Sequence, residues 1–132
     1  MKAIVLGIDQ NVDRAASQAA TVLDLFDTDT IRVYLLHDFV DNPEGASVTQ
    51  IDAVKRAQEL LEDEGVAVEL REGSGDPAES IIETADELDA DAICVAGRNR
   101  SPAGKVLFGS VTQSVVLNTD RPVLIASEAD TA

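Results

Sequence analysis

The chain has 132 residues and a mass of 14.0 kDa, with 45% hydrophobic and 27% charged residues, which is enough for one domain with a sizeable core. Its one cysteine, Cys94, excludes an intrachain disulfide framework. No apolar stretch approaches the roughly 18 residues of a membrane-spanning helix, and the N-terminal apolar run, closed by Asp9, is too short for a signal peptide. We therefore expect a single domain over residues 1–132 that is cytoplasmic and does not enter a membrane.

Charge limits the partners further. Twenty-five acidic residues against ten basic ones give a net charge of −15, and a surface of this sign repels nucleic acid and anionic lipid. Only three of the ten bases are lysines, and self-repulsion of this size would destabilise a small domain at low salt. The composition favours a cytoplasm rich in salt, as in a halophile. An ordinary acidic protein is the alternative.

The first half of the chain alternates strand and helix patterns. Residues 2–9 are a continuous apolar run that ends in an acid, as in a strand buried on both faces. Asn11 is a helix cap, and apolar residues at helical spacing continue to about Phe26. A second strand is expected over 31–37, a loop over 38–47 and a helix over 49–64, which Gly65 ends.

The second half repeats this alternation. Residues 66–70 alternate as a third strand, and Gly73-Ser74-Gly75 predicts a turn. Asp76 and Pro77 mark a helix start, with Glu79 in the position of a capping box. A buried strand over 92–96, a helix capped by Ser110 and running to about Leu117, a strand over 122–126 and a frayed tail complete the chain. Five strands separated by four helices predict an α/β fold with an open parallel sheet and right-handed crossovers.

Ligands of such sheets bind beyond the carboxyl ends of the strands, where the strand order reverses. Residues 7–9, 37–38 and 97–110 follow strands and are the candidate segments. No acidic residue occurs between positions 92 and 119, while Arg98, Arg100 and Lys105 bring positive charge to a glycine-containing loop before a helix. A helix N-terminus with guanidinium groups nearby suits a phosphate. The alternative is that the glycines only make turns and the arginines pair with surface acids.

Other polar residues carry weaker signals. Asp9 ends the first strand and either accepts a hydrogen bond from a ribose or caps the following helix together with Asn11. His37 is the only histidine, so a His/Cys metal site is not expected, and a packed role is favoured for it. Cys94 lies inside an apolar run and is expected to be buried and inert. No Walker, GxGxxG, GxSxG or HExxH motif and no nucleophile–base pair is present, so an enzyme is not favoured.

Taken together, these segments resemble the universal stress protein family, in its small single-domain form, over almost the whole chain. The similar segments are residues 4–9, 35–37, 75–77, 96–97, 108–112 and 121–125. The resemblance implies a Rossmann-like sheet of strand order 3-2-1-4-5, with an adenine nucleotide between strands 1 and 4. It also implies a homodimer through the last strand, Pro122 to Ala126, whose apolar edge invites pairing with a second copy. Other protein partners are not indicated.

The family's nucleotide motif has a glycine, two residues, a second glycine, nine residues, and then glycine with Ser or Thr. By this resemblance Asp9 would face the ribose and adenine, Gly97 would start the phosphate loop, and Gly109 and Ser110 would bind phosphate. The full set of nucleotide-binding candidates is Gly7, Ile8, Asp9, Asp38, Ala96, Gly97, Asn99, Arg100, Gly109, Ser110 and Val111.

This chain departs from the family's pattern in three places. Arg100 replaces the second glycine, the gap from Arg100 to Gly109 holds eight residues, and Asp38 stands where the family has an apolar residue against the base. The resemblance implies a dimeric stress-response protein that binds ATP or another adenine nucleotide, with Mg²⁺ accompanying it, and without fast catalysis. A module of the same fold that binds no nucleotide is the alternative, and slow ATP hydrolysis is a weaker third hypothesis.

Overall fold

A five-stranded parallel sheet forms the centre of the molecule in a computed structural model, which describes residues 1–39, 51–100 and 106–127, with backbone only at 98–100 and 106–107. The sheet order is β3-β2-β1-β4-β7, which confirms the order predicted above. Its strands are β1 (Lys2–Gly7), β2 (Ile31–Phe39), β3 (Ala67–Ser74), β4 (Ala92–Ala96) and β7 (Val123–Ala126). A separate antiparallel pair, β5 (Arg98–Arg100) and β6 (Val106–Leu107), follows the carboxyl end of β4.

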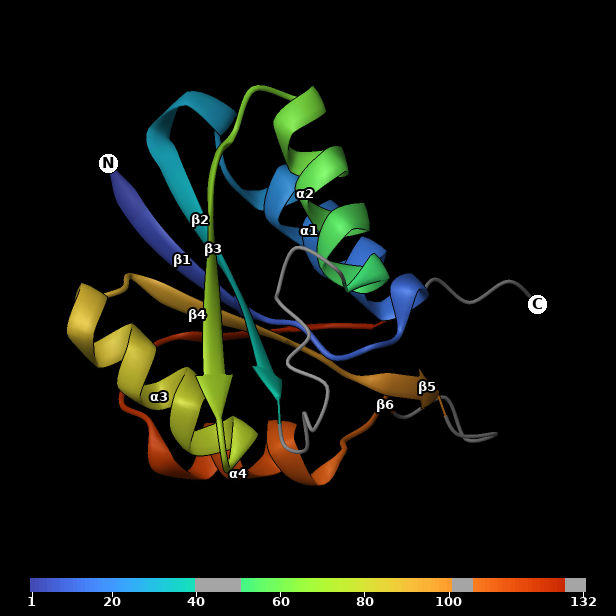
Figure 1. Cartoon of the computed structure of the whole chain (residues 1–132), viewed down its shortest axis with the longest axis vertical. Helices are drawn as coiled ribbons and strands as arrows, with labels where there is room; N and C mark the ends of the chain where they lie inside the picture. The colour runs from blue at the N-terminus through green and yellow to red at the C-terminus, as the bar shows by residue number, and fades with distance from the viewer. Residues whose placement is uncertain (40–50, 101–105, 128–132) are drawn as a thin grey trace.

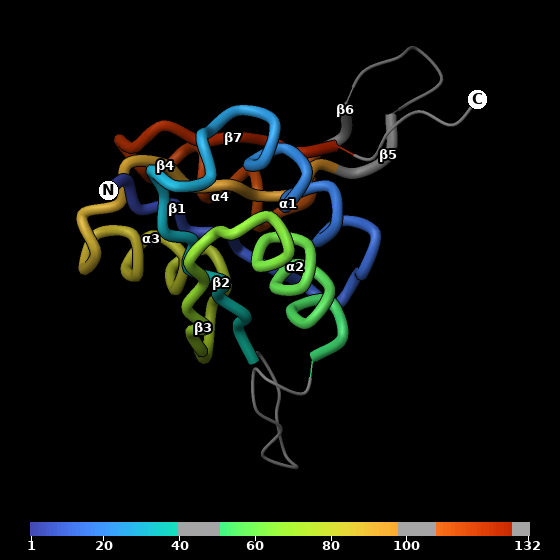
Figure 2. The backbone as a smooth tube through the Cα atoms, turned by 90° about the horizontal axis from the view of Figure 1, so that it is seen from above, coloured from blue at the N-terminus to red at the C-terminus, as the bar shows by residue number. Residues whose placement is uncertain are grey.

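In the described part of the chain, four α-helices cover the two faces of this sheet (Figure 1). Helices α1 (Val12–Leu25) and α2 (Asp52–Asp63) lie on one face, and α3 (Pro77–Leu88) and α4 (Ser110–Asn118) lie on the other. The view from above shows α2 and α3 on opposite sides of β2 and β3 (Figure 2). A short 3₁₀ helix, η1 (Thr28–Thr30), precedes β2. None of the helices described for this chain combines the length and the apolar composition that crossing a bilayer requires.

Local sequence signals explain where several helices begin and end. The Asn11 side chain accepts a hydrogen bond from the Arg14 N–H at 3.0 Å, and the Asp76 side chain accepts one from the Glu79 N–H at 3.0 Å. Both caps therefore satisfy backbone donors that a helix leaves free in its first turn. Gly65 has a φ of +84° just after α2, a conformation that favours glycine.

Two hydrophobic clusters hold the helices to the sheet. The first cluster packs α1 and α2 against the sheet and includes Ile4, Leu6, Leu35, Leu61 and the buried Cys94. The second cluster packs α3 and α4 against the other face and includes Val5, Leu36, Ile81, Ile93 and Val115. Neighbouring residues of one strand thus enter opposite clusters, as alternation along a strand requires.

Four details differ from the predictions. The second strand continues through Asp38 and Phe39, which were assigned to a loop, and the third strand continues through Gly73 and Ser74, which were assigned to a turn. These four residues pair with each other in register, Asp38 with Gly73 and Phe39 with Ser74. The hairpin β5–β6 was not predicted. Ser110 is the first residue of α4 and does not cap it, because Gly109 occupies the cap position without a side-chain hydrogen bond.

Other predictions fall wholly or partly outside the described residues. These are the remainder of the loop predicted over 38–47, the first two residues of the helix predicted over 49–64, Lys105, and all but Ser127 of the frayed tail predicted over 127–132.

Candidate functional site

A cleft of about 350 Å³ opens at the carboxyl ends of the central strands. It lies between the ends of β1, β2 and β4 and the first turns of α3 and α4. The pairing of β1 with β4 runs only from Ile4–Ala92 to Leu6–Cys94. After it, β1 leads into α1 on one face, whereas β4 leads toward α4 on the other. The strands diverge there because their connections leave in opposite directions, which opens a crevice at the reversal of strand order.

Eight of the eleven predicted nucleotide-binding residues line this cleft. They are Gly7, Ile8, Asp9, Asp38, Ala96, Gly109, Ser110 and Val111. Gly97 does not line it, and its N–H donates instead to the Ala126 carbonyl at 2.7 Å, which extends the pairing of β4 with β7. Asn99 and Arg100 lie in β5, where the structure describes the backbone alone.

Gln18 of α1 bridges the diverging strands β1 and β4. Its Nε2 donates to the Gly7 carbonyl at 2.9 Å and to the Cys94 carbonyl at 3.2 Å. Its side chain is buried, so the amide supplies both of these carbonyls with a donor where the pairing of β1 with β4 ends. The prediction overlooked Gln18, although a polar residue among the alanines of an apolar helix face was a visible signal.

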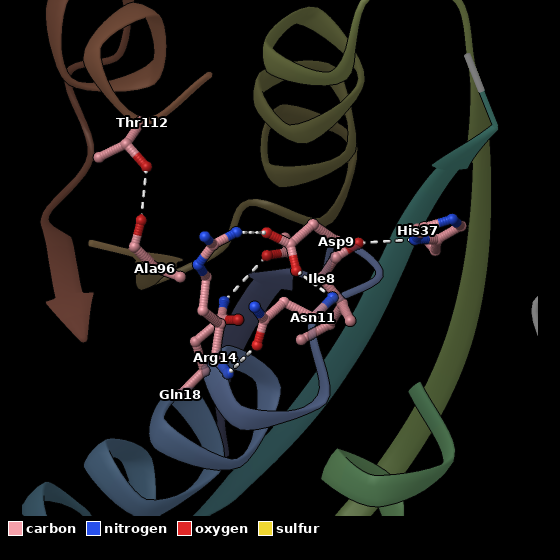
Figure 3. Close-up of polar contacts among 9 residues, drawn as sticks. Ile8, Asp9, Asn11, Arg14, Gln18, His37, Ala96 and Thr112 are labelled. Carbon is pink, nitrogen blue, oxygen red and sulfur yellow. Dashed lines mark hydrogen bonds and ion pairs between the residues drawn. The ribbon is translucent and has the colours of Figure 1, made fainter. Parts of the chain in front are cut away.

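Asp9 lies at the mouth of the cleft and is already engaged (Figure 3). Its Oδ1 accepts from the Asn11 N–H at 2.8 Å, and its Oδ2 pairs with Nη1 of Arg14 at 2.9 Å. The helix-start role considered for Asp9 is therefore present in the structure. Arg14 also lines the cleft, and the sequence had not marked it. Because the Asp9 side chain is 50% exposed, water screens this ion pair and we expect it to contribute about 0–1 kcal/mol.

His37 has the packed role that was favoured for it. Its Nδ1 lies 2.7 Å from the Ile8 carbonyl (Figure 3), and since a carbonyl only accepts, Nδ1 carries the proton. The ring is 5% exposed and meets the edge of Phe39 at a centroid distance of 4.8 Å. His37 thus fixes the turn after β1. The other isolated group, Cys94, is fully buried, and this burial raises the pKa of its thiol to about 12, so it is inert at neutral pH.

The start of α4 forms the opposite wall of the cleft. Thr112 Oγ1 donates to the Ala96 carbonyl at 2.8 Å, which ties the first turn of α4 to the end of β4 (Figure 3). Gly109, Ser110 and Val111 also line the cleft here. The first N–H groups of a helix have no partner within the helix, so this turn can present backbone donors and a positive dipole end to an anion.

Asp38 forms the third wall together with α3. Its Oδ2 accepts a hydrogen bond from Ser80 Oγ at 2.5 Å. Its Oδ1 is buried and contacts no hydrogen-bond donor within residues 1–39, 51–100 and 106–127. Sequence reasoning missed Ser80, because 42 positions separate it from Asp38 and no local pattern joins them.

The sheet order and the crevice define an open Rossmann-like α/β protein with a cleft at the switch point. A profile described as the universal stress protein family matches residues 1–127. The chain belongs to the universal stress protein family, as the resemblance had indicated.

Individual relatives agree with this assignment. A universal stress protein of Mycolicibacterium smegmatis is 40% identical over 65 residues, which cover 48% of this chain and 50% of that protein, so the chain spans about half of this relative's length. A universal stress protein structure from Archaeoglobus fulgidus superposes with a TM-score of 0.76 at 29% identity, covering 96% of this chain and 98% of that one. Another from the same organism, solved in complex with dAMP, superposes with a TM-score of 0.72 at 24% identity and covers the same shares.

Proposed function

We propose that this chain is a stress-response protein that binds an adenine nucleotide in the cleft. The observation that carries the proposal is the position of the cleft. It lies where the order of the parallel strands reverses, and the first turn of α4 opens onto it. In open α/β sheets this is the place where nucleotides bind, with their phosphates at a helix N-terminus. The dAMP complex of the similar Archaeoglobus fulgidus protein supports an adenine nucleotide as the ligand class.

The phosphate end of the ligand would lie at α4. Gly109 and Ser110 stand at its start, and the adjoining segment of the sequence, residues 97–109, contains Arg98, Arg100 and Lys105. These features favour ATP or a related adenine nucleotide. Mg²⁺ would accompany the phosphates and neutralise part of their charge. The proposal includes no fast catalytic step, and slow ATP hydrolysis would appear as phosphate release above that of a buffer control.

One observation favours the alternative, a module of the same fold without a nucleotide. Asp9, which the resemblance places against the ribose, already has both oxygens engaged by Asn11 and Arg14. A ribose would have to share or displace these partners.

Titration of the protein with ATP and adenosine separates the two functions. If ATP binds, it stabilises the folded state by about 2.7 kcal/mol at a hundredfold excess over its dissociation constant. Arg100→Ala would weaken ATP more than adenosine if the guanidinium contacts phosphate, whereas Arg100→Gly would strengthen ATP if Arg100 blocks the site. Arg32→Ala, at an exposed position at the other end of the sheet, is the matched control. No ATP binding by any of the four proteins would leave only the module.

Assembly is a second part of the proposal. We propose a cytoplasmic homodimer that pairs through residues 122–126, because β7 is an edge strand and the neighbouring Leu117 is 75% exposed on α4. The carbonyls of Pro122 and Ala126 accept from β4, so alternation turns the N–H of Val123 toward the open edge.

Light scattering in high salt tests this proposal, with about twice 14.0 kDa expected for the wild type. Val123→Pro removes a donor on the open side alone and should give a folded monomer. A monomeric wild type at micromolar concentration would overturn the proposal.

A further inference from the structure

Asp38 lies in the wall of the cleft, and within the described residues only one of its two carboxylate oxygens accepts a hydrogen bond. Ser80 Oγ donates to Oδ2, while Oδ1 is buried and has no donor among the described residues. Asp38 takes part in none of the ion pairs found within those residues. Arg14 pairs with Asp9, and Arg71 pairs with Glu69 on the edge strand β3. A buried acceptor without a donor costs free energy, so such an atom in a binding cleft calls for a donor from the ligand.

The surroundings of Asp38 are shaped to hold it in this position. Gly73 of β3 lies opposite Asp38 in register. A Cβ at Gly73 would lie 2.9 Å from both Cβ and Oγ of Ser80 and 3.2 Å from Oδ2 of Asp38. Glycine is therefore needed here for space, because any larger residue would push against the Asp38–Ser80 pair. The neighbouring cleft residues Leu36, Pro77 and Ile81 are apolar and offer no donor from their side chains.

We propose that Asp38 Oδ1 accepts a hydrogen bond from the exocyclic amino group of the purine, so that Asp38 makes the cleft selective for 6-amino over 6-oxo purines. This inference rests on the proposed nucleotide function and assigns its base specificity to one side chain. A single open oxygen matches a single N–H of a 6-amino group. The 6-oxo group of hypoxanthine would set its lone pairs against the carboxylate, and the two N–H donors of guanine would require both oxygens, one of which Ser80 already uses.

Whether a carboxylate at position 38 suits a purine depends on whether it meets the face or the edge of the base. A carboxylate is unfavourable against the apolar face of a base, but favourable at an edge that carries an N–H donor. The apolar neighbours Leu36, Pro77 and Ile81 can cover the faces of the ring system, while Asp38 reads its edge. Asp38 is thus a specificity-determining residue in this proposal.

Calorimetric titration of the wild-type protein with four 5′-monophosphates tests the proposal. AMP carries the 6-amino group, the monophosphate of purine riboside carries hydrogen there, and IMP and GMP carry oxygen. All four share the ribose and the phosphate, so the contribution of the phosphate cancels in the comparison. AMP should bind about ten- to a hundredfold more tightly than the purine riboside monophosphate, which is the range for a hydrogen bond to a charged group, and more tightly still than IMP.

Two variants and a control complete the test. Asp38→Asn can turn its amide N–H toward a 6-oxo group, so the AMP-to-IMP preference should shrink by about tenfold or more. Asp38→Ala should remove the preference for AMP over the purine riboside monophosphate. Asp24→Asn changes an exposed acid of α1 on the other face of the sheet and should leave every ratio unchanged.

The outcomes separate the role of Asp38 from the nucleotide function itself. Equal binding of AMP, IMP and the purine riboside monophosphate by the wild type would overturn the role of Asp38 and leave the nucleotide function standing. Tighter binding of GMP would overturn it in favour of guanine recognition by both carboxylate oxygens. Failure of all four ligands to bind would overturn the nucleotide function and this inference with it. The wild-type panel decides even if an Asp38 variant does not fold.

Discussion

Gly7 of β1 packs against Ile81 of α3, and a double-mutant cycle measures what this contact contributes to stability. An ideal Cβ on Gly7 would lie 2.4 Å from Cδ1 and 3.0 Å from Cγ1 of Ile81, so Gly7→Ala forces a buried side chain to move. Overpacking of this kind costs about 1–3 kcal/mol, whereas removing a glycine from a strand returns about 0.5–1 kcal/mol. We therefore expect Gly7→Ala to lower the free energy of unfolding by about 1–2 kcal/mol.

Ile81→Val removes the Cδ1 atom that the new Cβ would meet. Alone it should cost about 0.5–1.5 kcal/mol. In the Gly7→Ala background the 2.4 Å contact no longer exists, so the double variant should be about as stable as Ile81→Val, with a coupling energy of about 1 kcal/mol. Denaturant unfolding followed by far-UV circular dichroism at fixed KCl measures all four proteins, since the chain has no tryptophan.

The control is a substitution at the neighbouring residue of α3, Ile82→Val. The effects of Ile82→Val and Gly7→Ala on the free energy of unfolding should be additive within about 0.3–0.5 kcal/mol, because Ile82 is not among the groups nearest to a Cβ at Gly7. If the effects of Gly7→Ala and Ile81→Val on the free energy of unfolding are also additive, the reasoning is refuted. Additivity would show that the contact with Ile81 does not cause the destabilisation by Gly7→Ala.

Three further predictions concern the core and the surface charge. Gln18→Leu removes the side-chain donor to the Gly7 and Cys94 carbonyls and should lower the free energy of unfolding by about 1–3 kcal/mol. The exposed Gln113→Leu should change it by no more than about 0.5 kcal/mol, and equal effects of the two substitutions would contradict the bridging role of Gln18. Burial raises the pKa of Cys94 to about 12 from an ordinary 9.0, so between these pH values only the unfolded chain loses the thiol proton. The free energy of unfolding should therefore fall as pH rises from 9 toward 12. If a Cys94→Ala variant shows the same dependence of stability on pH, Cys94 is not its cause. The melting temperature should rise from low to molar KCl as the −15 charge is screened, and a flat profile would favour the ordinary acidic protein.

The sequence predicted those parts of the fold that local rules determine. The caps by Asn11 and Asp76 were predictable because a side chain within three residues satisfies the free N–H groups of a helix. The apolar strands β1 and β4 were predictable because both of their faces are buried. The strand order came from the resemblance to the family, and the structure confirms it.

Features that depend on contacts distant in the chain were not predictable. Gly73 and Ser74 have the composition of a turn, yet they continue β3 because Asp38 and Phe39 offer backbone partners on β2. The hydrogen bond of Ser80 to Asp38 likewise joins two elements that no periodicity relates. The Asp9–Arg14 ion pair was also missed, although it is local, since the two residues are five positions apart.

The helices around the cleft differ in how many of their side chains are buried. Helix α1 buries four residues and α3 buries three, but α4 buries only Thr112 and Val115. Since sub-global opening costs least where the fewest apolar contacts are broken, amide hydrogens of α4 should exchange with solvent before those of α1. The helix that is proposed to present backbone donors to a phosphate is therefore also the one that should open most readily. A ligand bound there would slow exchange in α4 first, while the first hydrophobic cluster on the far side of the sheet keeps its protection.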